Sequence, residues 1–549
     1  EYGGASFTVK NDKVFFTNWD DQRIYCIDDK KIFPITPSSH LEKSLRYSDL
    51  TLTKDIKWII CIRENHDNEG EPINEIVAVK TDGSFDVKIL ISGNDFYSSP
   101  RLNKNNDKLT WTQWNHPNMP WDETELCSAP IDSKNCSIGE INFIAGGDGI
   151  SILQPNWSDK GELVYVSDES GWWNLHKSNN GKNKNILDES KEHAGPSWQF
   201  GFKTYDFYKK DNIIIRGLSD DKKEGLIRIL DLNGKIKEEI NLDHTQISYL
   251  NVHGDNLFFI GSSPSKNDEI IKYGIEDKSV EIIKKSSDLE IPNSELSIAE
   301  EINFSTTNNS KAYAFYYPPK NNNYSNNDIN PPLLVISHGG PTSAASNSLS
   351  LSIQFWTNRG FAVVDVNYRG STGYGRKYRD ELKGNWGVYD AEDCIAAVKY
   401  LSEEKLIDPK KVVIKGGSAG GYTTINALTF YDNFAAGATY YGIADLSVFI
   451  NDTHKFESMY LESLIGKYPK EKQKYYDRSA INFTEKLSAP MIILQGSEDK
   501  IVPVSQAEIM ADALKKKQIP HALIIFEGEQ HGFRKAENIK LAIGFKIEV

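Results

Sequence analysis

The stretch Val412-Val413-Ile414-Lys415-Gly416-Gly417-Ser418-Ala419-Gly420-Gly421-Tyr422 decides how the second half of this chain is interpreted. A short β-branched apolar run ends at a glycine, a serine follows two residues later, and the residues from Tyr422 to Phe430 are typical of a helix. The pattern predicts a strand, a tight turn and a helix, with Ser418 at the turn. Gly416 and Gly420 have no Cβ atom, so the backbone can bend sharply and hold the serine hydroxyl clear of the sheet.

A Gly-x-Ser-x-Gly pattern is a weak signal by itself, because about one chain in five of this length contains one by chance. Its context must therefore decide. A serine hydroxyl is a poor nucleophile at neutral pH and needs a histidine to take its proton, with a carboxylate fixing the imidazole tautomer. In the α/β-hydrolases the acid follows the serine in the chain, and the histidine follows the acid.

Residues of both types follow in that order. The run from Met491 to Gly496 is typical of a buried strand, and Asp499 comes just after it. The run from His521 to Phe526 is the next such strand, and His531 follows it. We therefore predict Ser418, Asp499 and His531 as a catalytic triad.

Other interpretations of the acid and the base remain open from the sequence. Asp499 taken singly could cap a turn, and His531 taken singly could be a surface loop residue. Glu498 and Glu529 are rival acids that are less well placed. His521 is a rival base, but it lies at the start of a strand instead of beyond its end.

Acyl transfer also needs donors for the negative charge that develops on the carbonyl oxygen. One donor is the N–H of the residue after the nucleophile, here Ala419. The second usually comes from a glycine loop after an earlier strand, and the run Leu333 to Ser337 leads into His338-Gly339-Gly340-Pro341. We predict Gly340 as this donor, with Gly339 as the next choice and an ordinary glycine turn as the alternative.

Composition sets the class of protein. With 549 residues the chain predicts two or three domains, and its 39% hydrophobic and 26% charged residues are those of a globular protein. The net charge of −14 argues against nucleic acid or an anionic membrane as the main partner. The sequence shows no apolar run long enough to span a membrane and no basic leader. It also lacks the residue spacing of zinc, EF-hand and P-loop sites, so we expect no cofactor or metal. Five sparse cysteines favour the cytoplasm.

Residues 1 to about 290 carry many short runs rich in Val, Ile, Tyr, Trp and Phe, separated by Asn, Asp, Gly and Lys. Residues 99–111 and 154–166 are similar to each other, residues 47–58 form a looser copy, and further units begin near Pro196 and Thr245. Units of about 40 to 55 residues with four strands are typical of a β-propeller. We predict a propeller of about six to seven blades, the first incomplete, over residues 1–292, followed by an α/β-hydrolase domain over residues 293–549.

Two propeller loops stand out. Residues 114–126 are long and aromatic, and residues 167–175 contain two adjacent tryptophans. We interpret Trp172 as a substrate contact and expect a carboxylate from Glu123, Glu125 or Glu169 to bind the α-ammonium group of a peptide. The alternative is that these residues pack between blades.

From Leu333 onward strand runs alternate with helical patterns, which predicts a largely parallel sheet with crossover helices. The stretch Asn367-Tyr368-Arg369-Gly370-Ser371-Thr372-Gly373-Tyr374-Gly375 does not have the G-x-G-x-x-G spacing of a nucleotide site. Tyr441, Phe456 and Tyr460 are predicted walls of the substrate pocket, with core packing as the alternative for each.

With the triad, the His-Gly-Gly-Pro loop, the Asn-Tyr-Arg-Gly-Ser-Thr-Gly-Tyr-Gly stretch and a preceding propeller, the chain resembles the prolyl oligopeptidase family of serine peptidases. It looks most similar to the acylaminoacyl-peptidase and dipeptidyl-aminopeptidase branch. The resemblance implies cleavage of short peptides, with the propeller excluding folded proteins. It implies Ser418 as nucleophile, His531 as general base and acid, Asp499 as orienting carboxylate, and Gly340 and Ala419 as oxyanion donors.

The predicted function is therefore a serine oligopeptidase, aminopeptidase or acylaminoacyl-peptidase that works through an acyl-enzyme. One alternative is a carboxylesterase or amidase with the same triad, because the triad accepts either leaving group. Another is an inactive propeller-hydrolase that serves as a binding scaffold. The sequence leaves the residue preference, the natural substrate and the oligomeric state open, and a homo-oligomer is compatible with it.

Overall fold

The structure is a computed structural model, and it describes residues 3–67, 69–179, 181–209, 211–218, 225–324 and 330–548. Two compact units divide the chain. The first consists of residues 1–261 and 270–284, and the second of residues 262–269 and 285–549. The expected boundary at residues 292 and 293 stays a prediction.

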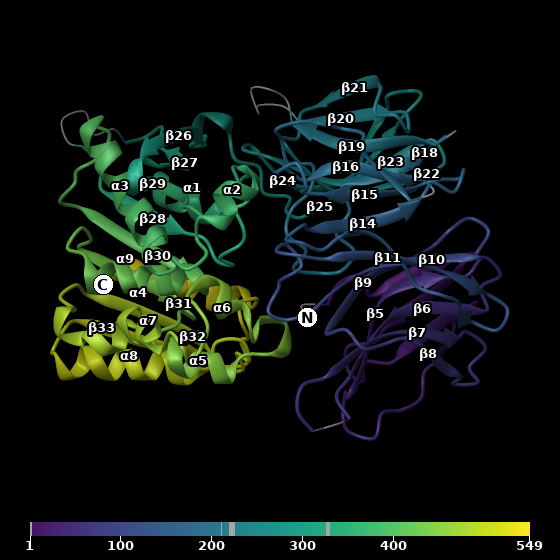
Figure 1. The fold of residues 1–549 in the computed structure, drawn as a ribbon. Helices are drawn as coiled ribbons and strands as arrows, with labels where there is room; N and C mark the ends of the chain where they lie inside the picture. Colours follow the sequence, from purple (N-terminus) through teal and green to yellow (C-terminus); the bar gives the residue numbers. More distant parts are fainter. Residues whose placement is uncertain are drawn as a thin grey trace. The chain divides into compact units, whose positions relative to one another are not determined.

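Six sheets follow one another along residues 7–285, and all of their residues outside 262–269 and 285 belong to the first unit (Figure 1). The first three contain β1 (Phe7–Lys10), β2 (Lys13–Thr17), β3 (Ile24–Asp28) and β4 (Lys31–Pro34); β5 (Leu45–Leu52), β6 (Trp58–Asn65), β7 (Ile73–Lys80) and β8 (Val87–Ile91); and β9 (Phe96–Leu102), β10 (Lys108–Trp114), β11 (Glu125–Asp132), β12 (Ser137–Ile138) and β13 (Asn142–Gly146).

The next three sheets repeat this arrangement. They contain β14 (Ile152–Trp157), β15 (Leu163–Ser167), β16 (Asn174–Asn179) and β17 (Lys182–Asn185); β18 (Tyr205–Tyr208), β19 (Asn212–Leu218), β20 (Gly225–Leu230) and β21 (Ile236–Leu242); and β22 (Gln246–His253), β23 (Asn256–Ser263), β24 (Lys266–Gly274) and β25 (Val280–Lys285). This is a β-propeller with six blades, which confirms the predicted class.

The internal repeat that predicted the propeller has a backbone counterpart. The first strand of four blades contains one residue with a positive φ at a matching position: Asp49 (56°), Ser99 (55°), Gln154 (53°) and Tyr249 (56°). In β5, β9 and β14 the pairing register shifts beside this residue, which is the signature of a β-bulge. The similar stretches around residues 47, 99 and 154 therefore encode the same bent strand.

The prediction that the first blade is incomplete was wrong. β1 to β4 form a four-stranded sheet like the sheets that follow it. These strands have only four or five residues and lack the polar-turn repeat found near residues 99 and 154, so the repeat pattern did not reveal them.

Apolar side chains from successive blades join to form the propeller core. In one cluster Ile60 and Ile62 of β6 pack with Leu109 and Trp111 of β10, and all four are at most 1% exposed. A blade can bury both of its faces only against neighbouring blades, so each core cluster lies between two sheets. This explains the absence of a simple apolar–polar alternation in β6 and β15.

The second unit contains an eight-stranded sheet in the order β26-β27-β29-β28-β30-β31-β32-β33, parallel from β29 onward. Its strands are β26 (Glu300–Ser305), β27 (Lys311–Tyr317), β28 (Leu333–Ser337), β29 (Ala362–Asn367), β30 (Val412–Gly417), β31 (Ala436–Tyr440), β32 (Met491–Gly496) and β33 (His521–Phe526). The predicted α/β-hydrolase sheet is thereby confirmed.

Helices cover both faces of this sheet (Figure 1). They are α1 (Leu351–Thr357), α2 (Gly375–Asp380), α3 (Tyr389–Glu403), α4 (Ala419–Phe430), α5 (Leu446–Asp452), α6 (Tyr460–Leu464), α7 (Lys472–Asp477), α8 (Val504–Lys516) and α9 (Ala536–Glu548), with 3-10 turns at Asn293–Glu295, Thr307–Asn309, Lys455–Glu457 and Ala480–Lys486. None of the described helices is long and apolar enough to cross a membrane.

The two faces of the sheet are covered by different helices. Leu334 and Val363 pack with Ile353 and Trp356 of α1 on one face. On the other face α4 lies so close to β31 that a Cβ atom at Gly437 would come within 2.5 Å of Leu428. The parallel strands all end at one edge, so side chains that follow β28, β30, β32 and β33 meet there.

Candidate active site

The predicted strand, turn and helix around Ser418 are present as β30, a one-residue turn and α4. Ser418 has φ 55° and ψ −121°, a conformation that costs free energy for any residue with a side chain. A Cβ atom at Gly416 would lie 2.1 Å from the Gly420 carbonyl oxygen, and one at Gly420 would lie 2.0 Å from that of Ser337. Glycine is therefore required at both positions for the turn to close.

Asp499 and His531 come together beyond the ends of β32 and β33. His531 Nδ1 donates to Asp499 Oδ2 at 2.8 Å, and Asp499 is 6% exposed. The other carboxylate oxygen accepts from the backbone N–H groups of Ile501 and Val502, both at 2.9 Å. Because Nδ1 carries the proton in this bond, Nε2 is left as the acceptor that a general base needs.

The rival residues lie elsewhere. Glu498 is exposed, and the Glu529 carboxylate accepts from the backbone N–H groups of Arg534 and Lys535. His521 Nδ1 bonds the carbonyl of Ile519 at the opposite end of β33 from His531. The geometry therefore favours the Asp499–His531 pair over the alternatives.

The glycine loop after β28 runs beside the Ser418 turn. A Cβ atom at Gly339 would lie 3.2 Å from the Gly417 carbonyl oxygen and 3.6 Å from Ser418 Cβ. Gly340 has φ +119°, a conformation that favours glycine. Ala419 is the first residue of α4, and an amide in the first turn of a helix has no intrahelical acceptor. Both predicted oxyanion donors are thus placed on the two segments that flank Ser418.

Tyr441 adjoins the predicted triad. It follows β31, has φ 39°, and its ring centroid lies 4.6 Å from that of His531. Its backbone N–H donates to the Leu494 carbonyl of β32 at 2.8 Å, so the residue is fixed between two strand ends. Burial raises the pKa of the Tyr441 hydroxyl, so this hydroxyl stays protonated and can donate a hydrogen bond.

Phe456 and Tyr460, the other two predicted pocket walls, are only 3% and 4% exposed. The Tyr460 hydroxyl contacts Thr342 twice, at 3.2 Å to its backbone N and 2.5 Å to Oγ1. Tyr460 therefore contacts the loop that follows β28. A role of Phe456 and Tyr460 as pocket walls stays a prediction, with core packing as the alternative.

The predicted ammonium-binding carboxylates differ in availability. Glu123 Oε2 accepts from the Gly149 N–H at 2.7 Å, and Glu125 Oε2 accepts from Gln113 Nε2 at 3.0 Å. The Glu169 side chain is 62% exposed, with Nδ1 of His176 4.0 Å away. Of the three carboxylates, Glu169 is the one that remains largely open to solvent.

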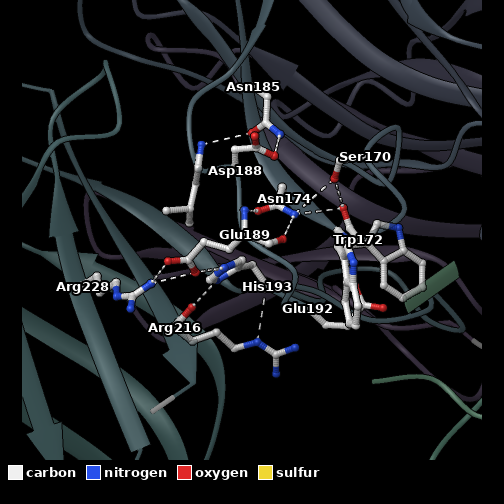
Figure 2. A network of polar contacts seen from close by, with 12 residues as sticks. Ser170, Trp172, Asn174, Asn185, Asp188, Glu189, Glu192, His193, Arg216 and Arg228 are labelled. Carbon is white, nitrogen blue, oxygen red and sulfur yellow. Dashed lines mark hydrogen bonds and ion pairs between the residues drawn. The ribbon is translucent and has the colours of Figure 1, made fainter. Parts of the chain in front are cut away.

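A buried polar network holds the loop that contains Trp172 (Figure 2). Asn174 Nδ2 donates to the carbonyls of Trp172 (3.2 Å) and Glu189 (2.8 Å). The Glu189 carboxylate accepts from His193 Nε2 at 2.9 Å and Arg228 Nη1 at 2.7 Å. These partners hold the pKa of Glu189 at about 2, the His193 bond having the largest effect. The loop around Trp172 is therefore a fixed part of its blade.

Comparison with known proteins agrees with this architecture. Residues 347–544 match the model of the prolyl oligopeptidase family. A puromycin-hydrolyzing peptidase from Mycobacterium tuberculosis superposes with a TM-score of 0.94 at 33% identity, covering 100% of this chain and 86% of that one. The chain belongs to the prolyl oligopeptidase family. The predicted family is thereby confirmed.

Curated proteins are similar to this chain over shorter stretches. Dipeptidyl aminopeptidase BIII of Pseudoxanthomonas mexicana is 32% identical over 209 residues, which are 37% of this chain and 30% of that protein. Acylamino-acid-releasing enzyme 1 of Oryza sativa subsp. japonica is 31% identical over 211 residues, 37% of this chain and 27% of that protein. The chain thus matches less than a third of the length of these curated relatives.

Sequence reasoning missed the residues that support the glycine loop. Tyr368 and Ser371, which follow His338 by 30 and 33 residues, both bond it: the Tyr368 hydroxyl donates to its carbonyl at 3.0 Å and Ser371 Oγ lies 2.7 Å from Nε2. The available signal was that His-Gly-Gly-Pro and Asn-Tyr-Arg-Gly-Ser follow adjacent parallel strands, β28 and β29, at the same sheet edge.

Proposed function

We propose that this protein is a serine peptidase that hydrolyses short peptides through an acyl-enzyme at Ser418. The observation that carries the proposal is the 2.8 Å bond from His531 Nδ1 to the buried Asp499, at the sheet edge where Ser418 occupies a strained turn. His531 Nε2 takes the Ser418 proton, and Oγ attacks the peptide carbonyl carbon. The same nitrogen then protonates the leaving amine, and water releases the acyl group by the reverse sequence.

The oxyanion of each tetrahedral intermediate is bound by the N–H groups of Gly340 and Ala419 in this proposal. The position of these two residues supports this assignment, because they belong to the segments on either side of Ser418. Donors fixed before the reaction need no reorganisation as charge develops, which makes such sites effective.

The two branches of the family differ in whether the amino terminus of the substrate is free or acylated. We propose that the enzyme favours a free amino terminus, and the support is the exposed carboxylate of Glu169, which can pair with an α-ammonium group. Among related structures, a puromycin hydrolase variant is described as complexed with PGG; it is 31% identical with a TM-score of 0.91 over 97% of this chain and 83% of that one.

The test compares one peptide arylamide series in free and acetylated forms. We expect faster cleavage of the free form, and Glu169→Gln should lower that preference. Glu125→Gln serves as the matched control, because Glu125 is already bonded by Gln113. Equal or faster cleavage of the acetylated form would indicate an acylaminoacyl-peptidase or endopeptidase instead, and Glu169 would then be a solvent-exposed residue.

The cytoplasm remains our proposal for the compartment. The structure supports it with five cysteines that are all free and buried: Cys26, Cys61, Cys127, Cys136 and Cys394. A reducing environment suits a protein whose thiols are unpaired. Fractionation of cells that produce the protein tests this location.

A further inference from the structure

The Gly339–Gly340 peptide unit supplies the second oxyanion donor in the proposed function, yet its own sequence does little to fix its orientation. Both flanking residues are glycines, and Gly340 has φ +119°. Glycine allows wide changes of φ and ψ at low cost, so this peptide could rotate and turn its carbonyl toward Ser418. Something outside the two glycines must hold the N–H of Gly340 in place.

The side chain of His338 makes that contact. Its Nδ1 lies 2.8 Å from the Gly339 carbonyl oxygen. A carbonyl oxygen can only accept, so Nδ1 carries the proton and donates it. The Gly339–Gly340 bond is trans, so its carbonyl and the N–H of Gly340 point in opposite directions. Fixing the carbonyl toward the imidazole therefore fixes the N–H on the other side.

The imidazole is itself held on three sides. Ser371 Oγ lies 2.7 Å from Nε2, which is free to accept once Nδ1 carries the proton. The Tyr368 ring stacks on the imidazole with centroids 4.3 Å apart and planes 15° apart, and its hydroxyl lies 3.3 Å from Nδ1. Burial lowers the pKa of His338 to about 4, so the ring stays neutral and Nε2 remains an acceptor near neutral pH.

Further hydrogen bonds connect the rest of the glycine loop to the stretch that contains Tyr368 and Ser371. The Thr372 N–H donates to the Ser343 carbonyl at 2.8 Å, and the Ala345 N–H donates to Asn367 Oδ1 at 2.8 Å. These bonds hold the ends of the loop, whereas the His338 ring bonds the carbonyl of the donor peptide itself. Among the bonds named here, the one from His338 is the one that reaches the carbonyl of the Gly339–Gly340 peptide.

We propose that His338 is a positioning residue that sets the orientation of the Gly339–Gly340 peptide, and that Ser371 and Tyr368 fix its ring for this purpose. This inference deepens the proposed function and rests on it. It gives the histidine that begins the glycine loop a role in positioning that loop. It also gives the Asn-Tyr-Arg-Gly-Ser stretch a role as the support of that ring.

Two substitutions of His338 distinguish the role of its Nδ1 donor from the role of the rest of the ring. The amide nitrogen of an asparagine can occupy the place of Nδ1 and donate to the Gly339 carbonyl. The amide of a glutamine reaches the place of Nε2 and leaves that carbonyl without a partner. We therefore expect His338→Asn to stay within about fivefold of the wild-type kcat. His338→Gln should lower kcat by about 10- to 100-fold, somewhat less than deletion of an oxyanion donor, with KM changed less than about threefold.

The control is His521→Gln, the same substitution at another histidine whose Nδ1 bonds a backbone carbonyl, at the far end of β33. We expect it to leave kcat unchanged. Should the His338 variants not fold, Ser371→Ala provides the second probe, because it removes the partner of Nε2 and should lower kcat by about three- to tenfold with KM unchanged. Equal losses in His338→Asn and His338→Gln, or no loss in His338→Gln or in Ser371→Ala, would overturn the proposal.

A crystal structure of His338→Gln tests the same point without turnover. We expect the Gly339 carbonyl to rotate from its wild-type direction, and to keep that direction in His338→Asn. An unrotated carbonyl in His338→Gln would overturn the proposal whatever the kinetics show. A wild-type protein that hydrolyses peptides no faster than Ser418→Ala would count against the proposed function alone, and the carbonyl direction would still decide the role of His338.

Discussion

Ser418→Ala should lower kcat for a peptide arylamide by about 10⁵- to 10⁶-fold, the loss expected when a catalytic serine is removed from an intact triad. The hydroxyl is the only part of the side chain that this change removes. Alanine keeps the Cβ atom at a position with φ 55°, so the backbone strain of the turn is nearly the same in both proteins. The turn and α4 should therefore remain folded.

The control for Ser418→Ala is its stability. We expect its free energy of unfolding, measured with urea, to lie within about 1 kcal/mol of the wild-type value, because no buried hydrogen bond is broken. Loss of turnover together with loss of the folded state would leave a structural explanation. Hydrolysis at more than a hundredth of the wild-type rate by purified Ser418→Ala would contradict the assignment of the nucleophile.

Asp499→Asn should lower kcat by about 10⁴-fold, because it selects the wrong imidazole tautomer. Oδ1 of Asp499 accepts from the N–H groups of Ile501 and Val502, so the amide oxygen of an asparagine must take that position. Its NH₂ group then faces His531 Nδ1, which must become an acceptor. The proton moves to Nε2, and that nitrogen can no longer take the proton of Ser418.

Glu498→Gln is the matched control for Asp499→Asn, because Glu498 precedes Asp499 directly and is exposed. We expect Glu498→Gln to retain full activity and Asp499→Asn to leave KM little changed. Single-turnover kinetics with the arylamide separate acylation from binding. A tenfold or smaller effect of Asp499→Asn, or a larger effect of Glu498→Gln, would mean that another carboxylate orients the histidine.

The parts of the fold that were predictable are those in which chain order and periodicity determine position. Parallel strands end at one sheet edge, so residues following Met491–Gly496 and His521–Phe526 had to come near Ser418, and the 2.8 Å bond from His531 to Asp499 agrees with this. The repeat at residues 99 and 154 predicted the propeller because it encodes one bent strand in each blade. The first blade was not predicted to be complete because its strands are short.

Side-chain partners far apart in the chain were not predictable. Tyr460 lies 118 residues from Thr342, which its hydroxyl contacts, so nothing local in the sequence indicated that it supports the loop. Glu125 has its partner Gln113 across a strand pair, and that register is fixed only in the folded blade. His338 and Ser371 were both noticed within motifs, yet their contact depends on two loops that meet beyond β28 and β29.

The most direct test of the central claim is labelling with a peptidyl phosphonate, followed by mass spectrometry of the digested protein. Such a reagent reacts only with a serine that a neighbouring base has activated. We predict one adduct, on Ser418, formed in wild-type protein and strongly slowed in Asp499→Asn. No adduct, or an adduct on another residue while Ser418 stays free, would contradict the account and would favour a binding scaffold over a peptidase.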